Sequence, residues 1–380
     1  MKKTHLLKRW LMAALLALGL SASALAAVPA SMKGLMYIGT LDSKLLAIKE
    51  DSGDIAAEIQ LGGIPRTVVL STDGTKLHLI TTKMQVETVD LVARKVISSF
   101  SLADPRTSPR MLRNAGGRSF SGIAVDPSGR YLYTGIQVTV KEIDQYRIDP
   151  PQFVTIDLQE KKIAKSIPFP KGYDSGFGFG ATYKVSPDGK LLYVFDEDIV
   201  SFNLADLKEV DRIPLAKPEY PGASPYRLQA ADDPNDEPGT VTTVFTSVDP
   251  IVHKETLGLG KLNLATKKVE YAPIGPAFPM VGFMLSPDRK LGYSLMVTRP
   301  GANRETQWWV WDINQQKVIK TESVVPRINF RPAMSSDGSM LYLFGGGSTI
   351  EIYDAKTLQA KKMVYLNKDS TTQLITVAGR

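Results

Sequence analysis

Short polar turns, each followed by a run in which apolar and polar residues alternate, recur along the whole chain. One copy reads SPDGKLLYVF at 186–195. Similar stretches are STDGTKLHLI at 71–80, DPSGRYLYTG at 126–135, SPDRKLGYSL at 286–295 and SSDGSMLYLF at 335–344. Alternation with a period of two residues is typical of β-strands, and Asp-Gly pairs are typical of hairpin turns. The pattern therefore predicts a chain of antiparallel strands.

The turn position defines a repeat. Seven such turns occur, each marked by a glycine or by the residue in its place, and successive marks are 40 to 60 residues apart. Each interval has room for four strands: one before the turn, one after it, one ending near Asp or Asn, and a Lys-rich one. Four strands in a unit of this length are typical of a β-propeller blade. We therefore predict an all-β fold, a seven-bladed propeller with four-stranded antiparallel blades, with marks at Gly34, Gly74, Gly129, Gly189, Gly239, Arg289 and Gly338.

The two ends of the chain complement each other in this scheme. Gly34 has few mature residues before it that could supply an innermost strand. The last repeat is followed by a spare alternating segment, TTQLITVAG, at 371–379. We expect this C-terminal strand to join the first blade and close the ring, which protects sheet edges that would otherwise stay unpaired.

Residues 1–26 have the parts of a secretory signal peptide. The basic stretch MKKTHLLKR precedes the apolar run WLMAALLALGL, and Ala24 and Ala26 form a cleavage site of the A-x-A type. The apolar run is shorter than the roughly 20 residues that a membrane-spanning helix needs. We predict cleavage after Ala26, export to the periplasm of a Gram-negative host, and a single propeller domain over 27–380.

Charge and cysteine content narrow the possible functions. Without residues 1–26 the chain carries 42 basic and 39 acidic residues, a balance that gives little support for a nucleic-acid partner. We expect no membrane partner either. The absence of cysteine excludes covalent c-type haem, thiolate metal sites and cysteine-based quinones in this chain. Its mature histidines are His78 and His253, and we predict no catalytic residue and no metal site.

The tryptophans of the mature chain lie together in QWWVWD, as Trp308, Trp309 and Trp311. On a strand, Trp309 and Trp311 would share one face and Trp308 would take the other. We expect these side chains to pack between blades.

Function is expected on the loops that join one blade to the next and the second strand of a blade to the third. These loops share one face of a propeller, and here they are long and unlike one another. Aromatic residues and arginines gather in them, and both types are enriched where proteins bind proteins. The alternative is that the aromatic residues only close the end of the tunnel. The predicted partner surface comprises Arg106, Arg110, Arg113, Phe120, Tyr173, Tyr220 and Tyr226.

One segment points to a particular family. Between the second and third strands of the third repeat, at 138–157, the chain carries the extension VTVKEIDQYRIDPPQFVTID, which a generic blade lacks. With its surroundings at 121–170 and the closing stretch at 325–366, it resembles the β subunit of quinohemoprotein amine dehydrogenase. The resemblance covers essentially the whole mature chain.

The resemblance implies a periplasmic complex of three chains that oxidises primary amines to aldehydes and ammonia. In that family the α subunit carries c-type haem, and the small γ subunit carries cysteine tryptophylquinone and the catalytic base. The propeller subunit is a scaffold and lines part of the substrate pocket, so no catalytic residue is transferred to this chain. From their loop positions, the predicted pocket wall comprises Phe177, Phe179, Phe278 and Phe330.

Two other functions stay open. One alternative is a solitary periplasmic propeller that binds a peptide or another macromolecule and has no redox partners. A propeller hydrolase would need metal ligands that converge in the tunnel. The candidate ligands are Asp126, Asp232, Asp233 and Asp288, and their place at turn ends favours a role in the hairpins.

Overall fold

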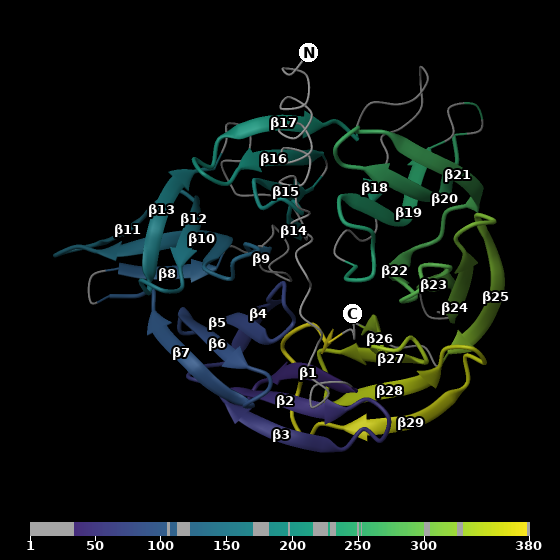
Figure 1. Cartoon of the computed structure of the whole chain (residues 1–380), viewed down its shortest axis with the longest axis horizontal. Coiled ribbons are helices and arrows are strands. Elements are labelled where there is room, and N and C mark those ends of the chain that lie inside the picture. Colours follow the sequence, from purple (N-terminus) through teal and green to yellow (C-terminus); the bar gives the residue numbers. More distant parts are fainter. Residues whose placement is uncertain are drawn as a thin grey trace, which may run out of the picture.

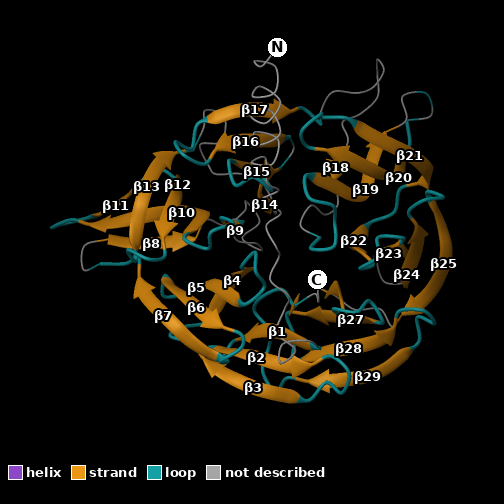
Figure 2. Ribbon diagram, in the orientation of Figure 1, coloured by secondary structure: helices purple, strands orange, loops and turns teal. Residues whose placement is uncertain are grey.

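The protein, a computed structural model, is a ring of seven β-sheets (Figures 1 and 2). The structure describes residues 34–104, 107–111, 122–169, 182–196, 198–215, 227–228, 233–248, 251, 253–299, 305–324 and 330–377. Every strand in these residues runs antiparallel to its neighbours, and none of the described residues forms a helix that could cross a membrane. The predicted seven-bladed propeller is confirmed. The predicted signal peptide lies outside the described residues.

The strands follow one another around the ring, in most blades from the innermost to the outermost. The first blade contains β1 (Leu35–Thr40), β2 (Lys44–Lys49) and β3 (Ile55–Gln60), and the second contains β4 (Pro65–Leu70), β5 (Lys76–Thr81), β6 (Gln85–Asp90) and β7 (Lys95–Ser101). The fourth contains β14 (Thr182–Val185), β15 (Leu191–Phe195), β16 (Ile199–Asn203) and β17 (Glu209–Ile213), and the fifth contains β18 (Arg227–Leu228), β19 (Thr240–Val248), β20 (Glu255–Asn263) and β21 (Val269–Pro276). The sixth contains β22 (Met280–Leu285), β23 (Leu291–Arg299), β24 (Glu305–Asp312) and β25 (Lys317–Val324), and the seventh contains β26 (Phe330–Met334), β27 (Met340–Gly345), β28 (Thr349–Asp354) and β29 (Ala360–Tyr365).

The third blade has six strands, two more than the repeat predicts. Its four regular strands are β9 (Ile123–Val125), β10 (Tyr131–Lys141), β12 (Gln152–Asp157) and β13 (Lys162–Pro168). The two additional strands are β8 (Thr107–Met111), inside a stretch that the sequence presents as a loop, and β11 (Tyr146–Ile148). Both pair with β10, because this strand is long enough to continue beyond the blade.

The polar turns that precede the second strand of most blades share one construction. The N–H of Gly189 donates to the carbonyl of Ser186 over 2.9 Å, and the Ser186 hydroxyl donates to Asp188 over 2.6 Å. Gly189 has a φ of 69°, a left-handed conformation that glycine adopts without steric cost. All seven predicted marks have a left-handed φ, including Arg289 at 59°. The sequence repeat therefore locates these turns correctly.

The hairpins between the third and fourth strands also contain one left-handed residue in each blade. The first blade uses Gly53, whereas the other six use residues with a side chain, at φ values between 50° and 64°. Such a residue costs about 1–2 kcal/mol, because its Cβ lies too close to the backbone. The six are Arg94, Lys161, Leu207, Lys267, Gln316 and Leu358.

The core lies between the blades. The buried apolar residues form seven clusters, one at each contact between neighbouring blades of the described ring. Trp308 belongs to the cluster between the sixth and seventh blades, and Trp311 to the cluster between the fifth and sixth. Both are fully buried. The expectation that the tryptophans pack between blades on opposite faces of one strand is confirmed for this pair.

The C-terminal segment closes the ring, as predicted. β30 (Ile375–Thr376) pairs with β1 and supplies the innermost strand of the first blade. The Thr371 N–H donates to the carbonyl of Gly39 in the first blade over 2.8 Å. Leu374 packs in the cluster shared with the seventh blade, whereas Val377 packs in the cluster shared with the second. The segment thus joins three blades.

The left-handed hairpin residues allow a matched test of backbone strain. Gln316 is exposed and has a φ of 51°, so Gln316→Gly should remove strain and raise the free energy of unfolding by about 0.5–1 kcal/mol. Its neighbour Gln315 is equally exposed but has no left-handed φ, so Gln315→Gly should lower that free energy by a similar amount. Urea unfolding of both variants measures the difference. If both variants change the free energy of unfolding in the same direction, Gln316 is not strained.

Candidate functional site

Three of the residues predicted for the functional face lie in the described part of the structure: Arg110, Phe278 and Phe330. The other predicted positions lie outside the described residues and stay predictions. For the pocket wall these are Phe177 and Phe179, and for the partner surface they are Arg106, Arg113, Phe120, Tyr173, Tyr220 and Tyr226.

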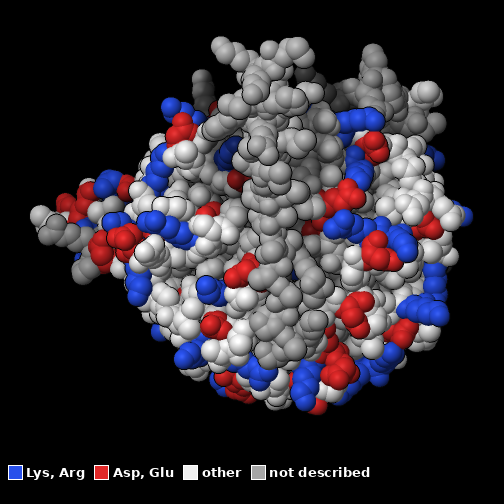
Figure 3. All heavy atoms as spheres, in the orientation of Figure 1, with Lys and Arg blue, Asp and Glu red and all other residues white. Residues whose placement is uncertain are grey.

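The most distinctive described feature of this face is an arm on the third blade. We define the arm as β8, β11, the turn 142–145 that precedes β11, and the outer end of β10 at 136–141. β10 lies between β8 and β11. Its Gln137 is directly opposite Arg110 of β8, and its Thr139 is directly opposite Ile148 of β11. The arm projects from the rim of the ring, at the left of Figures 1 and 3. Arg110 therefore belongs to a sheet that the propeller itself does not need.

The register divides the side chains of the arm between two faces, because directly opposed residues and residues two apart share a face. One face carries Arg110, Lys141, Tyr146 and Ile148, and we call it the basic face. Tyr146 is 71% exposed and Ile148 is 58% exposed. Two large apolar side chains thus stand in solvent beside two cations.

On the opposite face of the arm, the positive charge is neutralised by carboxylates of the arm itself. The Arg147 guanidinium donates to the Glu142 carboxylate over 3.0 Å and also bonds Asp149. The Arg110 guanidinium donates to the amide oxygen of Gln137 over 3.2 Å, and neither it nor Lys141 has an ion-pair partner among the described residues. The basic face therefore keeps its positive charge available.

The two described pocket-wall candidates lie in different cores. Phe278 is half-buried and meets the edge of Trp309, with ring centroids 6.3 Å apart, in the cluster between the fifth and sixth blades. Phe330 is 5% exposed and packs between the sixth and seventh blades. The structure does not bring the two phenylalanines into one cluster. Their role in a pocket wall stays a prediction, and Phe278 is the more accessible of the two.

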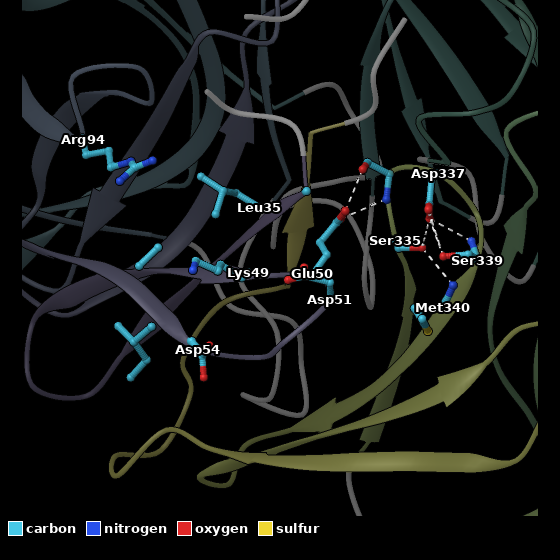
Figure 4. Close-up of a pocket in the computed structure, with 14 residues that line it drawn as sticks. Leu35, Lys49, Glu50, Asp51, Asp54, Arg94, Ser335, Asp337, Ser339 and Met340 are labelled. Carbon is cyan, nitrogen blue, oxygen red and sulfur yellow. Dashed lines mark hydrogen bonds between the residues drawn. The ribbon is translucent and has the colours of Figure 1, made fainter. Parts of the chain in front are cut away.

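A cavity that the sequence does not predict opens on the other face of the ring. Its volume is about 1000 Å³. It lies where turns of the first, second and seventh blades meet, and Figure 4 shows the residues around it. Its lining includes Leu35, Lys49, Glu50, Arg94, Ser336 and Met340.

Glu50 connects the first blade to the seventh at this cavity. Its carboxylate accepts the Ser336 N–H over 2.9 Å and the Ser336 hydroxyl over 2.6 Å, as the dashed lines in Figure 4 show. The side chain is only 6% exposed. Burial raises the pKa of Glu50 to about 7, although the bonds from Ser336 oppose this effect. The carboxyl therefore titrates near neutral pH, at the seam where the ring closes.

One irregularity in the repeat marks this site. In the other six blades the residue four positions before the left-handed hairpin residue is Asp or Asn, and its side chain accepts N–H groups of the turn. In the first blade this position, four before Gly53, is Lys49, which cannot accept a hydrogen bond. This departure from the repeat is the signal in the sequence that could have pointed to the site at Glu50. The bond partner Ser336, 286 residues away, was not predictable from it.

Neither site has the composition of a metal centre. No group of three or more His, Asp or Glu side chains able to hold a metal ion occurs among the described residues. The Glu50 carboxyl can bind and release a proton, and the exposed side chains of the arm can bind the surface of another molecule.

Comparison with known proteins supports the fold. No protein-family model matches the chain, and no curated protein is similar to it in sequence. Hydrazine synthase of Kuenenia stuttgartiensis is similar in structure, with 17% identity, coverage of 81% of this chain and 88% of that chain, and a TM-score of 0.49. Dihydro-haem d1 dehydrogenase NirN, in complex with DHE, has 13% identity, coverage of 93% and 76%, and a TM-score of 0.49. A functionally unknown protein from Desulfotomaculum acetoxidans has 10% identity, coverage of 92% and 100%, and a TM-score of 0.56. The last comparison agrees with the propeller fold, and such identities say nothing about function.

The raised pKa of Glu50 predicts a pH-dependent stability. The folded protein holds this proton more tightly than the unfolded chain, so the stabilisation is complete below pH 4.5 and is lost as the pH rises through about 7. Glu50→Gln keeps an acceptor for the Ser336 N–H but cannot ionise. We expect the variant to match the wild type near pH 4 and to exceed its free energy of unfolding by about 3 kcal/mol near pH 8. Urea unfolding at both pH values measures this.

The control is Glu160→Gln, at a hairpin of the third blade, where the carboxylate is 53% exposed. It shows how much of any difference comes from the removal of an exposed carboxylate alone. A constant stability difference between Glu50→Gln and the wild type at both pH values would show that Glu50 does not titrate there.

Proposed function

We propose that this chain is the non-catalytic propeller subunit of a periplasmic quinohemoprotein amine dehydrogenase. In the proposed complex, a small subunit carries cysteine tryptophylquinone and a further subunit carries haem c. The complex oxidises primary amines to aldehydes and ammonia. The propeller scaffolds both partner chains and lines part of the substrate pocket.

The arm is the observation that carries this proposal. The segment on which the family resemblance depends most, at 138–157, forms β11 and parts of β10 and β12. A blade needs none of the additional strands to complete its four-stranded sheet. Their exposed apolar side chains have a cost in water unless another surface covers them. An element of this kind suits a subunit whose work is to hold other chains.

The composition of the chain supports the same division of labour. Without cysteine, the chain cannot supply the thioether links of a c-type haem or a cysteine-based quinone. Redox chemistry of that kind would therefore belong to partner chains. The propeller contributes a rigid frame, because its strands are paired and its blades pack on both faces.

A solitary binding propeller is the second candidate, since an exposed arm would serve a peptide ligand as well. The two functions differ in what accompanies the chain. The decisive experiment is a gentle affinity purification of the tagged protein from the periplasm of its own host, grown on a primary amine.

We expect the purified material to show a haem c spectrum and to contain a larger and a much smaller chain at equal stoichiometry with the propeller. The same purification from cells grown without amine controls for induction. A colourless single chain of the mature mass from amine-grown cells would contradict the proposed function and leave the solitary propeller.

The two described phenylalanines give a prediction for the assembled enzyme. Phe330→Ala removes a buried ring and should lower the free energy of unfolding by about 3–5 kcal/mol. Phe278→Ala removes a half-buried ring near the predicted pocket, so it should raise KM for the amine more than it lowers stability. Steady-state kinetics and thermal unfolding of the complex separate the two effects. An unchanged KM in Phe278→Ala would remove this residue from the pocket wall.

A further inference from the structure

We propose that the basic face of the arm is the docking surface for a partner protein chain, and that it binds an acidic surface containing an apolar pocket. The proposal rests on the proposed function, because the partner is one of the two other chains of that complex. It adds residues outside the predicted partner surface: Lys141, Tyr146 and Ile148.

The apolar anchors of this face are side by side. Tyr146 and Ile148 are two residues apart on β11, so their side chains point the same way. Both stand largely in solvent, and Ile143 at the tip of the arm is fully exposed. A tyrosine ring buries much area and loses little side-chain freedom on binding, which is why tyrosine is common at the energetic centre of interfaces.

The charges of the arm define the chemistry of its partner. Arg147 on the opposite face is neutralised by Glu142 and Asp149. On the basic face, Lys141 lies directly opposite Tyr146, and Arg110 flanks the other side of β10. The exposed carboxylates near this charge are Asp144 at the tip and Asp104, which accepts the Thr107 N–H at the start of β8. An acidic partner surface is therefore favoured, and a second copy is disfavoured because two basic faces would repel.

The arm is also held in place before it binds. β10 is continuous from the blade into the arm, so the arm is anchored to the ring by a strand that pairs within the propeller. The bond from Arg110 to Gln137 further fixes one cation of the basic face. A surface that is already ordered loses little conformational entropy on association.

The test uses tagged variants of the full chain, purified from the amine-grown host as above. Tyr146→Ser with Ile148→Ser removes the apolar anchors, and Arg110→Glu with Lys141→Glu reverses the charge. The matched control is Tyr365→Ser with Ile319→Ser, which removes an exposed tyrosine and isoleucine from the outer strands of the seventh and sixth blades. Thermal unfolding confirms that each variant is folded.

We expect both arm variants to retain at least tenfold less of the haem c chain or of the small quinone-bearing chain than the wild type, and the control to retain both. Because salt screens charge, the deficit of the charge-reversal variant should shrink as salt is added. Full retention by both arm variants would overturn the docking proposal and leave the proposed function intact. If the wild type retains neither chain, the proposed function fails and this proposal fails with it.

Two further measurements test other occupants of the basic face. Sedimentation of the purified protein would reveal a dimer, and flotation with vesicles of phosphatidylglycerol and phosphatidylcholine would reveal lipid binding. Dimerisation or flotation that is lost in the Tyr146→Ser, Ile148→Ser variant would overturn docking to a partner protein. We expect neither.

Discussion

The structure depends on the burial of each blade between two neighbours. A four-stranded sheet with apolar residues on both faces is unstable when either face is exposed to water. Every blade therefore requires a neighbouring blade on each side. Only a closed ring satisfies this requirement for the first and last blades. The chain meets it by bringing β30 to β1, with Leu374 and Val377 packed in different inter-blade clusters. At the same seam, on the face that carries the hairpin turns, Ser336 of the seventh blade donates two hydrogen bonds to Glu50 of the first blade.

Much of this ring could be predicted from the sequence because its signals are local. The Asp-Gly turns specify their own left-handed residue, and the copy with Arg289 in place of glycine keeps the same conformation. The spare C-terminal segment predicted closure by simple counting. The burial of Trp308 and Trp311 on opposite faces followed from strand alternation.

The features that were not predicted depend on contacts between distant residues or on patterns without periodicity. β8 reads TSPRM, which has neither alternation nor β-branched enrichment, and it forms a strand because the long β10 offers an unpaired edge. Glu50 looks like an ordinary turn residue, and only its partner in the seventh blade makes it a buried carboxyl with a raised pKa. Of the predicted functional face, Arg110 proved to belong to a sheet, whereas Phe278 and Phe330 lie in separate clusters.

The two faces of the ring consequently differ in how well they tolerate substitutions and insertions. On the face of the hairpins, turn after turn requires a left-handed residue, and one buried carboxyl sits at the closing seam, so a change there acts on the stability of the whole ring. On the other face the loops join strands that are already paired, and an insertion costs only its own loop entropy. The arm has grown on this second face by prolonging β10. Only the base of its β10 segment, at Ile136 and Val138, packs in an inter-blade cluster, the one between the second and third blades. A scaffold can acquire binding surfaces most readily where the closure of its ring does not depend on them.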